Sequence, residues 1–485
     1  MSDSGGMGLE EVISGVNALV WGSATVSYPP VLILLLLTGL YLSLRLGFMP
    51  IRRIPYAFGQ LLRRRGPDEQ KEGDVSPFGA LMTALSSTIG TGNIAGVAVA
   101  IAIGGPGAVF WMWVTAFLGM ATKFSEASLA VRFREIDADG RHVGGPMYYM
   151  KNGLGPKWAF LGVIFSIFGI LASWGTGASI QANSIADALR ETYGIEPWAS
   201  GAALALAAGL VILGGIQRIA TVASGIVPAM AGGYLLAGLI VIGLNIDAVP
   251  AAFSQIMTNA FGIDAAKGGF VGGLLLLAMQ KGVARGVFSN EAGQGSAPIA
   301  HAAAQNKDPV NQGIVAMLGT FIDTIVVCSI TAFVILTANI IPESCAPFVR
   351  ESLVTLPAHC PNSAPLTVAA FDQSLPGLGK HIVAIGLTVF GFTTILGWSY
   401  YGERCSEFLF GEKIIKPFRW SWIVVTFAGA AVLMLEGGAV TDVVSLFWLI
   451  ADTFTGLMAA PNLIALVLLS PLVAKMAKDY FAERR

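Results

Sequence analysis

The sequence predicts an all-α integral membrane protein with about eleven transmembrane helices. Of its 485 residues 54% are hydrophobic and only 12% are charged, and the mean hydropathy is +0.69. Soluble domains carry about 25% charged residues. The apolar runs are about 20 residues long and do not alternate with polar residues, which indicates helices rather than a β-barrel. The basic residues lie at the ends of these runs, where membrane topology explains them, so no nucleic-acid partner is expected.

The N-terminal segment, residues 1–74, is expected to combine three features. Leu9 to Val20 is weakly amphipathic and is expected at the membrane interface. The first span is predicted from Tyr28 to Phe48. It ends beside arginines, and an arginine-rich loop follows, so we expect a cytoplasmic loop and an external N-terminus.

Ten further spans follow in the sequence. Their predicted bounds are Val75–Ile103, Ala108–Phe133, Trp158–Leu189, Trp198–Ile216, Ile219–Ile246, a span that starts near Gly268, Gln312–Ile340, Leu366–Tyr401, Trp420–Leu435 and Val440–Leu472. This topology leaves Arg190, Lys267, Arg350 and Lys380 outside and Lys123 within a span, and it counts the other 24 of the 29 Lys and Arg as cytoplasmic. Such an asymmetry is what the positive-inside rule requires.

The ten spans divide into two sets of five, residues 75–267 and 268–474, followed by a cytoplasmic tail, 475–485. Because each set holds an odd number of spans, the second set enters the membrane in the opposite orientation. Each set also opens with a glycine-rich interruption. Interrupted helices at matching positions of inverted repeats indicate the binding site of a secondary transporter near the bilayer midplane.

The first interruption is Ser86 to Gly96, which holds three glycines, two serines, two threonines and an asparagine. Irregular backbone survives at membrane depth only where protein or a hydrated cavity surrounds it. Close packing of small residues between helices is the competing explanation for this stretch alone. The second interruption, Ser289 to Ser296, favours the binding-site interpretation because it occupies the corresponding place in the other set.

A broken helix offers two polarities to a ligand. The N-terminus of its second half offers free N–H groups to a carboxylate, and freed carbonyls suit a small cation or an ammonium group. We therefore expect the pair of breaks to bind a zwitterion with Na⁺. The residues predicted to line this site on the two broken spans are Thr91, Gly92, Asn93, Phe288, Ser289, Asn290, Gly293 and Gly295.

Span nine is predicted to supply further groups. The hydroxyls of Thr393 and Thr394 would complete an oxygen cage for Na⁺, together with Ile89, Gly90 and Asn93 of span two. Hydrogen bonds from these hydroxyls to the preceding helical turn are the alternative. Trp398 lies on the face of Thr394 and either caps the pocket or packs against lipid or core.

Several other polar residues are predicted within spans. Gln181 and Asn183 either face the cavity or bond between helices. Glu291 is expected to pair with Arg285 or Lys281 and to act in structure or gating. Lys123 and Glu126, spaced i,i+3, are expected to pair with each other. The remaining candidates are Asp323, Asp442 and Asp452 for coupling or gating, and Cys345 and Cys360, which form either a disulfide or two free thiols.

Four motifs resemble the alanine or glycine:cation symporter family. They are T-I-G-T-G-N-I-A-G-V-A from Thr88, G-G-P-G-A-V-F-W-M-W-V-T-A from Gly104, G-G-P-M-Y-Y-M from Gly144 and F-S-N-E-A-G-Q-G-S-A-P-I-A-H from Phe288. The resemblance extends from about Ser76 to Trp398.

The resemblance implies Na⁺-coupled uptake of alanine or glycine across a bacterial or archaeal inner membrane. It also implies the five-plus-five inverted-repeat fold of the leucine transporter group with one extra N-terminal helix. It implies a pocket at Thr91, Gly92 and Asn93, the Ser289 to Gly293 turn, Gln181, and Thr394 with Trp398.

Three alternatives remain at this point. A proton-coupled or uncoupled transporter of another small amino acid, such as glutamine or serine, would use the same features. A channel or facilitator would move substrate without Na⁺. An intramembrane enzyme would need a paired nucleophile and base, and no such motif is evident in the sequence; no organic cofactor is expected either.

Overall fold

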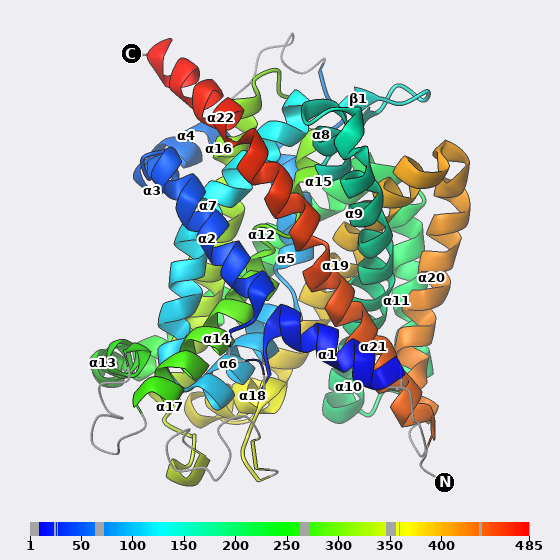
Figure 1. Ribbon diagram of the computed structural model, residues 1–485. Helices are drawn as coiled ribbons and strands as arrows, with labels where there is room; N and C mark the ends of the chain where they lie inside the picture. Colours follow the sequence, from blue (N-terminus) through cyan, green and yellow to red (C-terminus); the bar gives the residue numbers. More distant parts are fainter. Residues whose placement is uncertain are drawn as a thin grey trace, which may run out of the picture.

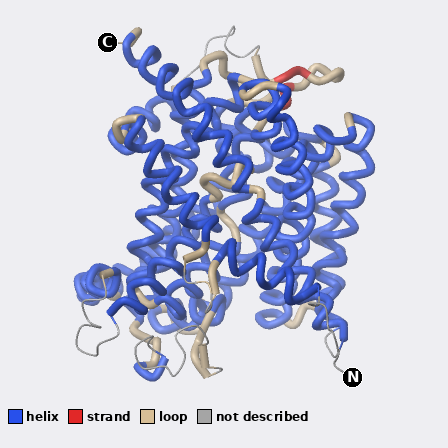
Figure 2. The backbone as a smooth tube through the Cα atoms, viewed as in Figure 1, coloured by secondary structure: helices blue, strands red, loops and turns tan. Residues whose placement is uncertain are grey.

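A computed structural model describes residues 9–23, 26, 28–63, 72–261, 271–345, 356–357, 359–435 and 439–484. Helices make up nearly all of this described part (Figure 2). The strands β1 (Glu135–Ile136) and β2 (His142–Val143) form a small antiparallel pair in the loop after α7. The predicted all-α membrane class is confirmed.

The helices up to the end of the first predicted repeat are the following. They are α1 Leu9–Trp21, α2 Pro30–Arg45, α3 Met49–Arg52, α4 Ile54–Leu62, α5 Pro77–Thr88, α6 Val97–Gly104, α7 Gly107–Arg132, α8 Pro146–Gly153, α9 Ala159–Ala172, α10 Ile180–Tyr193, α11 Pro197–Ile212, α12 Gly215–Leu244 and α13 Val249–Ala260, with π-helical turns at Gly92–Gly96 and Ser173–Ser179 and 3₁₀ turns at Pro156–Trp158 and Ile246–Ala248.

The remaining helices follow from the start of the second predicted repeat. They are α14 Val271–Asn290, α15 Ala297–Ala302, α16 Pro309–Thr320, α17 Ser329–Ala338, α18 Ser363–Ser374, α19 Gly379–Phe410, α20 Ile415–Ala431, α21 Ala439–Leu457 and α22 Ala459–Ala482, with a π-helical segment at Phe321–Cys328 and 3₁₀ turns at Glu343–Cys345, Glu412–Ile414 and Val432–Leu435.

Most predicted spans have a counterpart among these helices. Within the described residues, seven helical segments are long and apolar enough to cross a membrane, and the α5–α6 pair, bent by 56°, adds an eighth. The shorter apolar helices α2 and α11 occupy the positions of predicted spans one and five. The helix α14 occupies that of span seven. The first and last described helices, α1 and α22, reach opposite ends of the molecule (Figure 1), which is consistent with an odd number of spans.

The bounds of two predicted spans are wrong. Residues 366–401 do not form one span, because α18 ends before a Pro-Gly turn and α19 begins only at Gly379. Span eleven is one continuous candidate span, Ser445–Ala482, which extends beyond the predicted end at Leu472. A turn at Met458 separates α21 from α22 within it. Pro461 lies in the first turn of α22, where proline is tolerated because its missing N–H needs no partner within the helix.

The charge count behind the predicted topology also needs correction. Lys281 and Arg285 were counted with the cytoplasmic residues, but both lie inside α14. The asymmetry of the loops therefore rests on the remaining basic residues. Lys267, Arg350 and the side chain of Asp442 fall outside the described residues.

Cys345 and Cys360 form a disulfide, with their Cα atoms 5.7 Å apart. The question that the sequence left open is thereby answered for this pair. Cys328 and Cys405 are free and buried. Along the chain the two cysteines lie between α17 and α18, and these helices are at the same end of the molecule as α13 (Figure 1). The topology predicted from the sequence puts that end outside the cell.

Small residues allow the helices on either side of the core to approach closely. A Cβ atom at Gly282 of α14 would lie 2.2 Å from the carbonyl oxygen of Ala108 in α7 and 2.7 Å from Cβ of Trp111. In the membrane, helix association depends on such packing, because lipid tails are as apolar as the helix surfaces.

The substitution Gly282→Ala is expected to destabilise the protein by about 1–3 kcal/mol, since overpacking forces the two backbones apart. The control is Gly243→Ala in α12, where nothing lies within 4 Å of the added Cβ. Thermal unfolding in detergent measures both variants. Equal unfolding temperatures for the two variants would contradict close packing of α14 on α7.

Candidate functional site

The helix of span two is broken at Ile89 and Gly90. The first half, α5, ends at Thr88, and helical structure resumes with the π-helical turn Gly92–Gly96. The side chain of Asn93 reaches back across the break, and its Oδ1 accepts a hydrogen bond of 2.8 Å from the N–H of Gly90. The first N–H groups of the second half have no partner within a helix, so Thr91 and Gly92 present a positive helix end at the break.

The helix of span seven is broken between α14 and α15. Glu291, Gly293 and Gly295 have φ angles of 55°, 88° and 84°. Glycine adopts such left-handed values without steric cost, which explains the two glycines in this turn. The break therefore has a defined backbone shape rather than a loose helix end.

One buried carboxylate, Asp323, joins the two breaks. It lies in the π-helical segment Phe321–Cys328 of span eight and is fully buried. Its Oδ1 accepts a hydrogen bond of 2.7 Å from Nδ2 of Asn93, and its Oδ2 accepts one of 2.8 Å from the hydroxyl of Ser289. Spans two, seven and eight are thus tied together at one side chain.

A cavity of about 20 Å³ lies between the breaks, room for about one water molecule. It is lined by Ser87, Thr88, Gly90, Thr91, Gly92, Thr176, Gln181, Phe288, Glu291, Gln294, Thr394, Trp398 and Thr455. Seven residues predicted from the sequence therefore converge on one cavity: Gly90, Thr91, Gly92, Gln181, Phe288, Thr394 and Trp398.

Two amide side chains in this lining keep an acceptor free. Nε2 of Gln181 donates to the carbonyl oxygen of Thr176, and Nε2 of Gln294 donates to that of Val287. Among the described residues, neither Oε1 atom has a hydrogen-bond partner, although both are buried. Unpaired buried acceptors are costly, so these oxygens suit the ammonium group of a ligand or a cation.

The two threonines of span nine take different positions. Thr394 lines the cavity. Its Oγ1 lies so close to Gly90 that a Cβ atom added at Gly90 would be only 2.7 Å from it. Thr393 lies outside the cavity lining and contacts the sulfur of Met230 at 3.5 Å. Both hydroxyls also donate to the carbonyl oxygen of Phe390, so the hydrogen bond to the preceding turn is present in each case.

Glu291 connects the span-seven break to span nine. Its Oε1 accepts a hydrogen bond of 3.0 Å from Nε1 of Trp398, and its Oε2 accepts one from the hydroxyl of Ser296. The predicted pairing with Arg285 or Lys281 is wrong: the guanidinium of Arg285 lies 5.7 Å from the ring centre of Phe288 instead. The side chain at position 291 turns away from its own helix because the helix ends one residue earlier.

Lys123 and Glu126 do not form the predicted contact. Oε1 of Glu126 accepts hydrogen bonds from Asn462 at 2.7 Å and from the N–H of Gly295 at 3.2 Å. Nζ of Lys123 is buried without a hydrogen-bond partner among the described residues. Its charge nevertheless interacts with those of Glu126, Glu291 and Asp323. Lys123 therefore compensates Glu126, its neighbour on α7, together with Glu291 and Asp323 near the two breaks.

The other predicted residues lie beside the cavity rather than on it. Asn93, Ser289 and Asn290 are buried in the surrounding hydrogen-bond network, and Nδ2 of Asn290 donates to Thr324. A Cβ at Gly293 would meet side chains of α2 and α22, at Leu35 and Leu463.

Ile89 is fully buried, and its N–H bonds the carbonyl of Leu85. Asp452 accepts a hydrogen bond from Asn17 of α1 at 3.0 Å, which ties α21 to the N-terminal helix.

Sequence reasoning missed several lining residues. Thr176 lies between two glycines in the stretch Gly175-Thr176-Gly177 of span four, and its hydroxyl bonds that of Thr455 at 2.8 Å. Gln294 lies inside the span-seven motif itself. Thr455 lies in the polar run Asp452-Thr453-Phe454-Thr455-Gly456, of which only Asp452 was predicted to matter.

A second cavity of about 520 Å³ leads toward the site. It lies between α10, α18 and α19 and includes Thr91, which also lines the small cavity. Asn183, predicted beside Gln181, lines this vestibule and donates to the carbonyl oxygen of Gly429 at 3.2 Å. The vestibule lies at the end of the molecule that carries α10 and α18 (Figure 1).

The opposite end is closed by buried ion pairs. The guanidinium of Arg404 is 2% exposed and lies 2.6 Å from both Glu403 and Glu407. Glu403 also binds Arg419 at 2.5 Å, and Asp137, in the loop between β1 and β2, lies 3.7 Å from Arg404. The cluster joins α19, α20 and this loop on the side away from the vestibule.

Comparison with known proteins accounts for this arrangement. A model of the "Sodium:alanine symporter family" matches residues 7–485. The chain is 47% identical over 481 residues to "Sodium/alanine symporter AgcS" of Methanococcus maripaludis, covering 99% of both proteins. It is 35% identical over 479 residues to "Probable sodium/glutamine symporter GlnT" of Bacillus subtilis, covering 98% of this chain and 92% of that protein.

Solved structures support the fold. MhsT in complex with L-phenylalanine matches with a TM-score of 0.54 at 13% identity, covering 84% of this chain and 98% of the other. A Na⁺-coupled sialic acid symporter matches with a TM-score of 0.51 at 14% identity, covering 94% and 98%. The predicted leucine-transporter fold is confirmed, and identities this low show the fold alone. From the family model and the relatives that match over nearly their whole length, the chain belongs to the sodium:alanine symporter family.

Proposed function

We propose that this chain carries alanine or glycine into the cell by Na⁺-coupled symport. Its family makes it a cation-coupled amino-acid transporter of a cell membrane. The observation that carries the finer proposal is the small cavity between the two breaks, whose lining includes a positive helix end and two glutamines with unpaired amide oxygens. A zwitterion needs both polarities within a few ångströms.

In this proposal the substrate carboxylate binds the N–H groups of Thr91 and Gly92. Its ammonium group binds Oε1 of Gln181, with Gln294 as the second acceptor. Phe288 and Trp398 form the apolar walls. Because the cavity holds only about 20 Å³, it must widen to admit an amino acid, and alanine or glycine requires less widening than glutamine.

The coupling ion is proposed at the carbonyl end of α5. The carbonyls of Ile89 and Gly90 and the hydroxyl of Thr394 offer the neutral oxygens that Na⁺ accepts. Asn93 and Ser289, whose side chains bond Asp323, hold this geometry. Thr393, which bonds outside the cavity, is not needed for the ion.

Alternating access is proposed to occur between the vestibule and the Arg404 cluster. The vestibule reaches Thr91 from one side, while the buried ion pairs close the other. With the N-terminus outside and the C-terminus inside, as the basic residues predict, this arrangement faces outward. Opening to the cytoplasm then requires the ion pairs of Arg404 to separate.

Uptake of labelled alanine and glycine into proteoliposomes is expected to depend on an inward Na⁺ gradient and to saturate. Uptake of labelled glutamine and serine tests whether another amino acid is the main substrate. Uptake driven by a proton gradient alone tests proton coupling, and counterflow without any gradient tests uncoupled transport. Glutamine uptake faster than alanine uptake would overturn the assigned substrate. Alanine uptake that ignores Na⁺ would overturn the assigned coupling ion.

The variant Gln181→Ala is expected to raise the KM for alanine about tenfold or more, since a hydrogen bond to a charged group contributes about 1.5–3 kcal/mol. Asn183→Ala is the matched control, because Asn183 is on the same helix and also buried but lines only the vestibule. Initial rates over a range of alanine concentrations measure both. A KM that rises equally in both variants would remove Gln181 from the proposed ammonium site.

A double-mutant cycle tests the frame around the site. Asn93→Ala and Asp323→Ala are each expected to destabilise the protein, and the pair is expected to show an interaction energy of about 1–3 kcal/mol. Denaturation in detergent supplies the four free energies of unfolding. Combining Asn93→Ala with the distant Asn183→Ala should give additive effects. Additivity for Asn93 with Asp323 would contradict the direct bond between them.

A further inference from the structure

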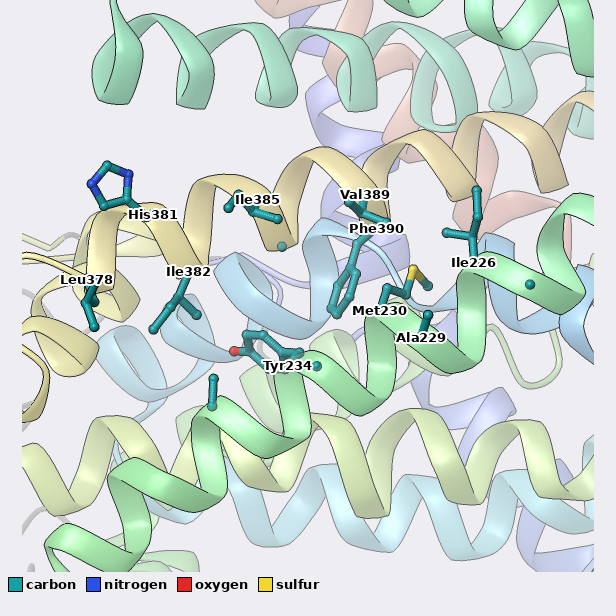
Figure 3. Close-up of a pocket in the computed structure, with 14 residues that line it drawn as sticks. Ile226, Ala229, Met230, Tyr234, Leu378, His381, Ile382, Ile385, Val389 and Phe390 are labelled. Carbon is teal, nitrogen blue, oxygen red and sulfur yellow. The ribbon is translucent and has the colours of Figure 1, made fainter.

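A groove of about 600 Å³ lies between α12 and α19, away from the transport path. Figure 3 shows Met230 and Ile226 of α12 and Ile385 and Val389 of α19 around it. Glycines of α12, at positions 225 and 233, widen the groove because they carry no side chain.

The groove opens on the surface that faces the lipid. Only 28% of the α12 span is buried inside the protein, and its exposed side chains include Leu236 and Leu239. Across the groove, Ile385 of α19 is 56% exposed. In a membrane protein such a surface contacts hydrocarbon, so an opening in it is filled from the hydrocarbon phase.

The polar groups of the described lining already have partners. The hydroxyl of Tyr234 bonds that of Thr331 at 2.8 Å, and Nδ1 of His381 bonds the hydroxyl of Tyr193 at 3.1 Å. The other lining residues are apolar. A cavity of this kind does not hold water well, and it offers nothing to a polar ligand.

The length of the groove matches one hydrocarbon chain. Its lining runs over 225–237 on α12 and 378–390 on α19, about 18 Å at 1.5 Å per residue. One leaflet of the hydrocarbon core is about 15 Å thick. We propose that the groove is a binding site for one acyl chain of a phospholipid from the surrounding bilayer, with its polar end near His381.

The floor of the groove connects this site to the broken helix of span two. The hydroxyl of Tyr234 donates to Thr331, and that of Thr331 donates to the carbonyl oxygen of Asn93 at 2.8 Å. The side chain of Ile94 packs against Gly386, since a Cβ atom added at Gly386 would lie 3.1 Å from it. An acyl chain in the groove therefore packs on the layer of side chains that supports the break, and it stabilises the protein.

The variant Gly233→Phe places a side chain in the groove. Gly232→Phe is the matched control. Nothing lies within 4 Å of a Cβ atom added at Gly232 or at Gly233, but Gly232 does not line the groove. Both proteins are reconstituted in vesicles that contain a phospholipid with a photoactivatable diazirine on one acyl chain. Labelled peptides are then identified by mass spectrometry.

Wild type and Gly232→Phe are expected to be labelled at Met230 and Ile385, and Gly233→Phe about tenfold less. Added phospholipid should raise the unfolding temperature of delipidated wild type and Gly232→Phe more than that of Gly233→Phe, whose groove is already filled. If Gly233→Phe does not fold, Gly225→Phe serves in its place.

Two results would overturn the proposal. One is equal labelling of the groove peptides in wild type and Gly233→Phe. The other is a wild-type groove that remains unlabelled while the variant Ile385→Cys forms disulfide-linked dimers in the membrane, because a second copy of the chain would then cover the groove. Both readouts are independent of transport, so they do not depend on the proposed substrate or ion.

Discussion

The bond network of Asp323 is the interaction on which this architecture depends. Breaking two helices inside a membrane exposes backbone groups that the bilayer cannot satisfy. Asp323 allows both breaks by binding Asn93 of one and Ser289 of the other, while Asn93 also accepts from the N–H of Gly90. A carboxylate is suited to this task because it accepts several hydrogen bonds at once. At the two breaks, which flank the cavity, side-chain hydrogen bonds hold the backbone in place of the usual helical hydrogen bonds.

Holding the two breaks with carboxylate side chains brings charge into the membrane interior. Glu126, Glu291 and Asp323 are buried close to a single ammonium group, that of Lys123. Buried charges are costly unless they are paired and hydrogen-bonded, and each carboxylate here binds amide, indole or hydroxyl donors. Glu126 and Asn462 together hold the turn at Gly293 and Gly295. Substituting any one of these side chains therefore disturbs both the local hydrogen bonds and the charge balance around the breaks.

Much of this arrangement could be predicted from the sequence, and the misses have physical causes. The breaks were visible because glycines and polar residues stand out in an apolar run, and Gln181, Thr394 and Trp398 converge on the cavity as expected. The predicted hydrogen-bonded pairs Lys123 with Glu126 and Glu291 with Arg285 are based on spacing along one helix. They are absent from the described residues because both carboxylates bind donors from other helices. Thr455 lies in the polar run Asp452-Thr453-Phe454-Thr455-Gly456, but only the packing of α21 on span four shows that its hydroxyl reaches the cavity.

Glu291 also bears on how such a protein can change over evolution. It is a non-glycine residue with a φ of 55°, a conformation that costs an L-residue roughly 1–2 kcal/mol. Glycine would relieve this strain, but it would remove the carboxylate that binds Trp398 and Ser296. The conformation that the backbone prefers and the contact between spans seven and nine are thus opposed at one position. A search for stabilising substitutions would favour glycine there, at the expense of the contact that fixes the span-seven break to α19.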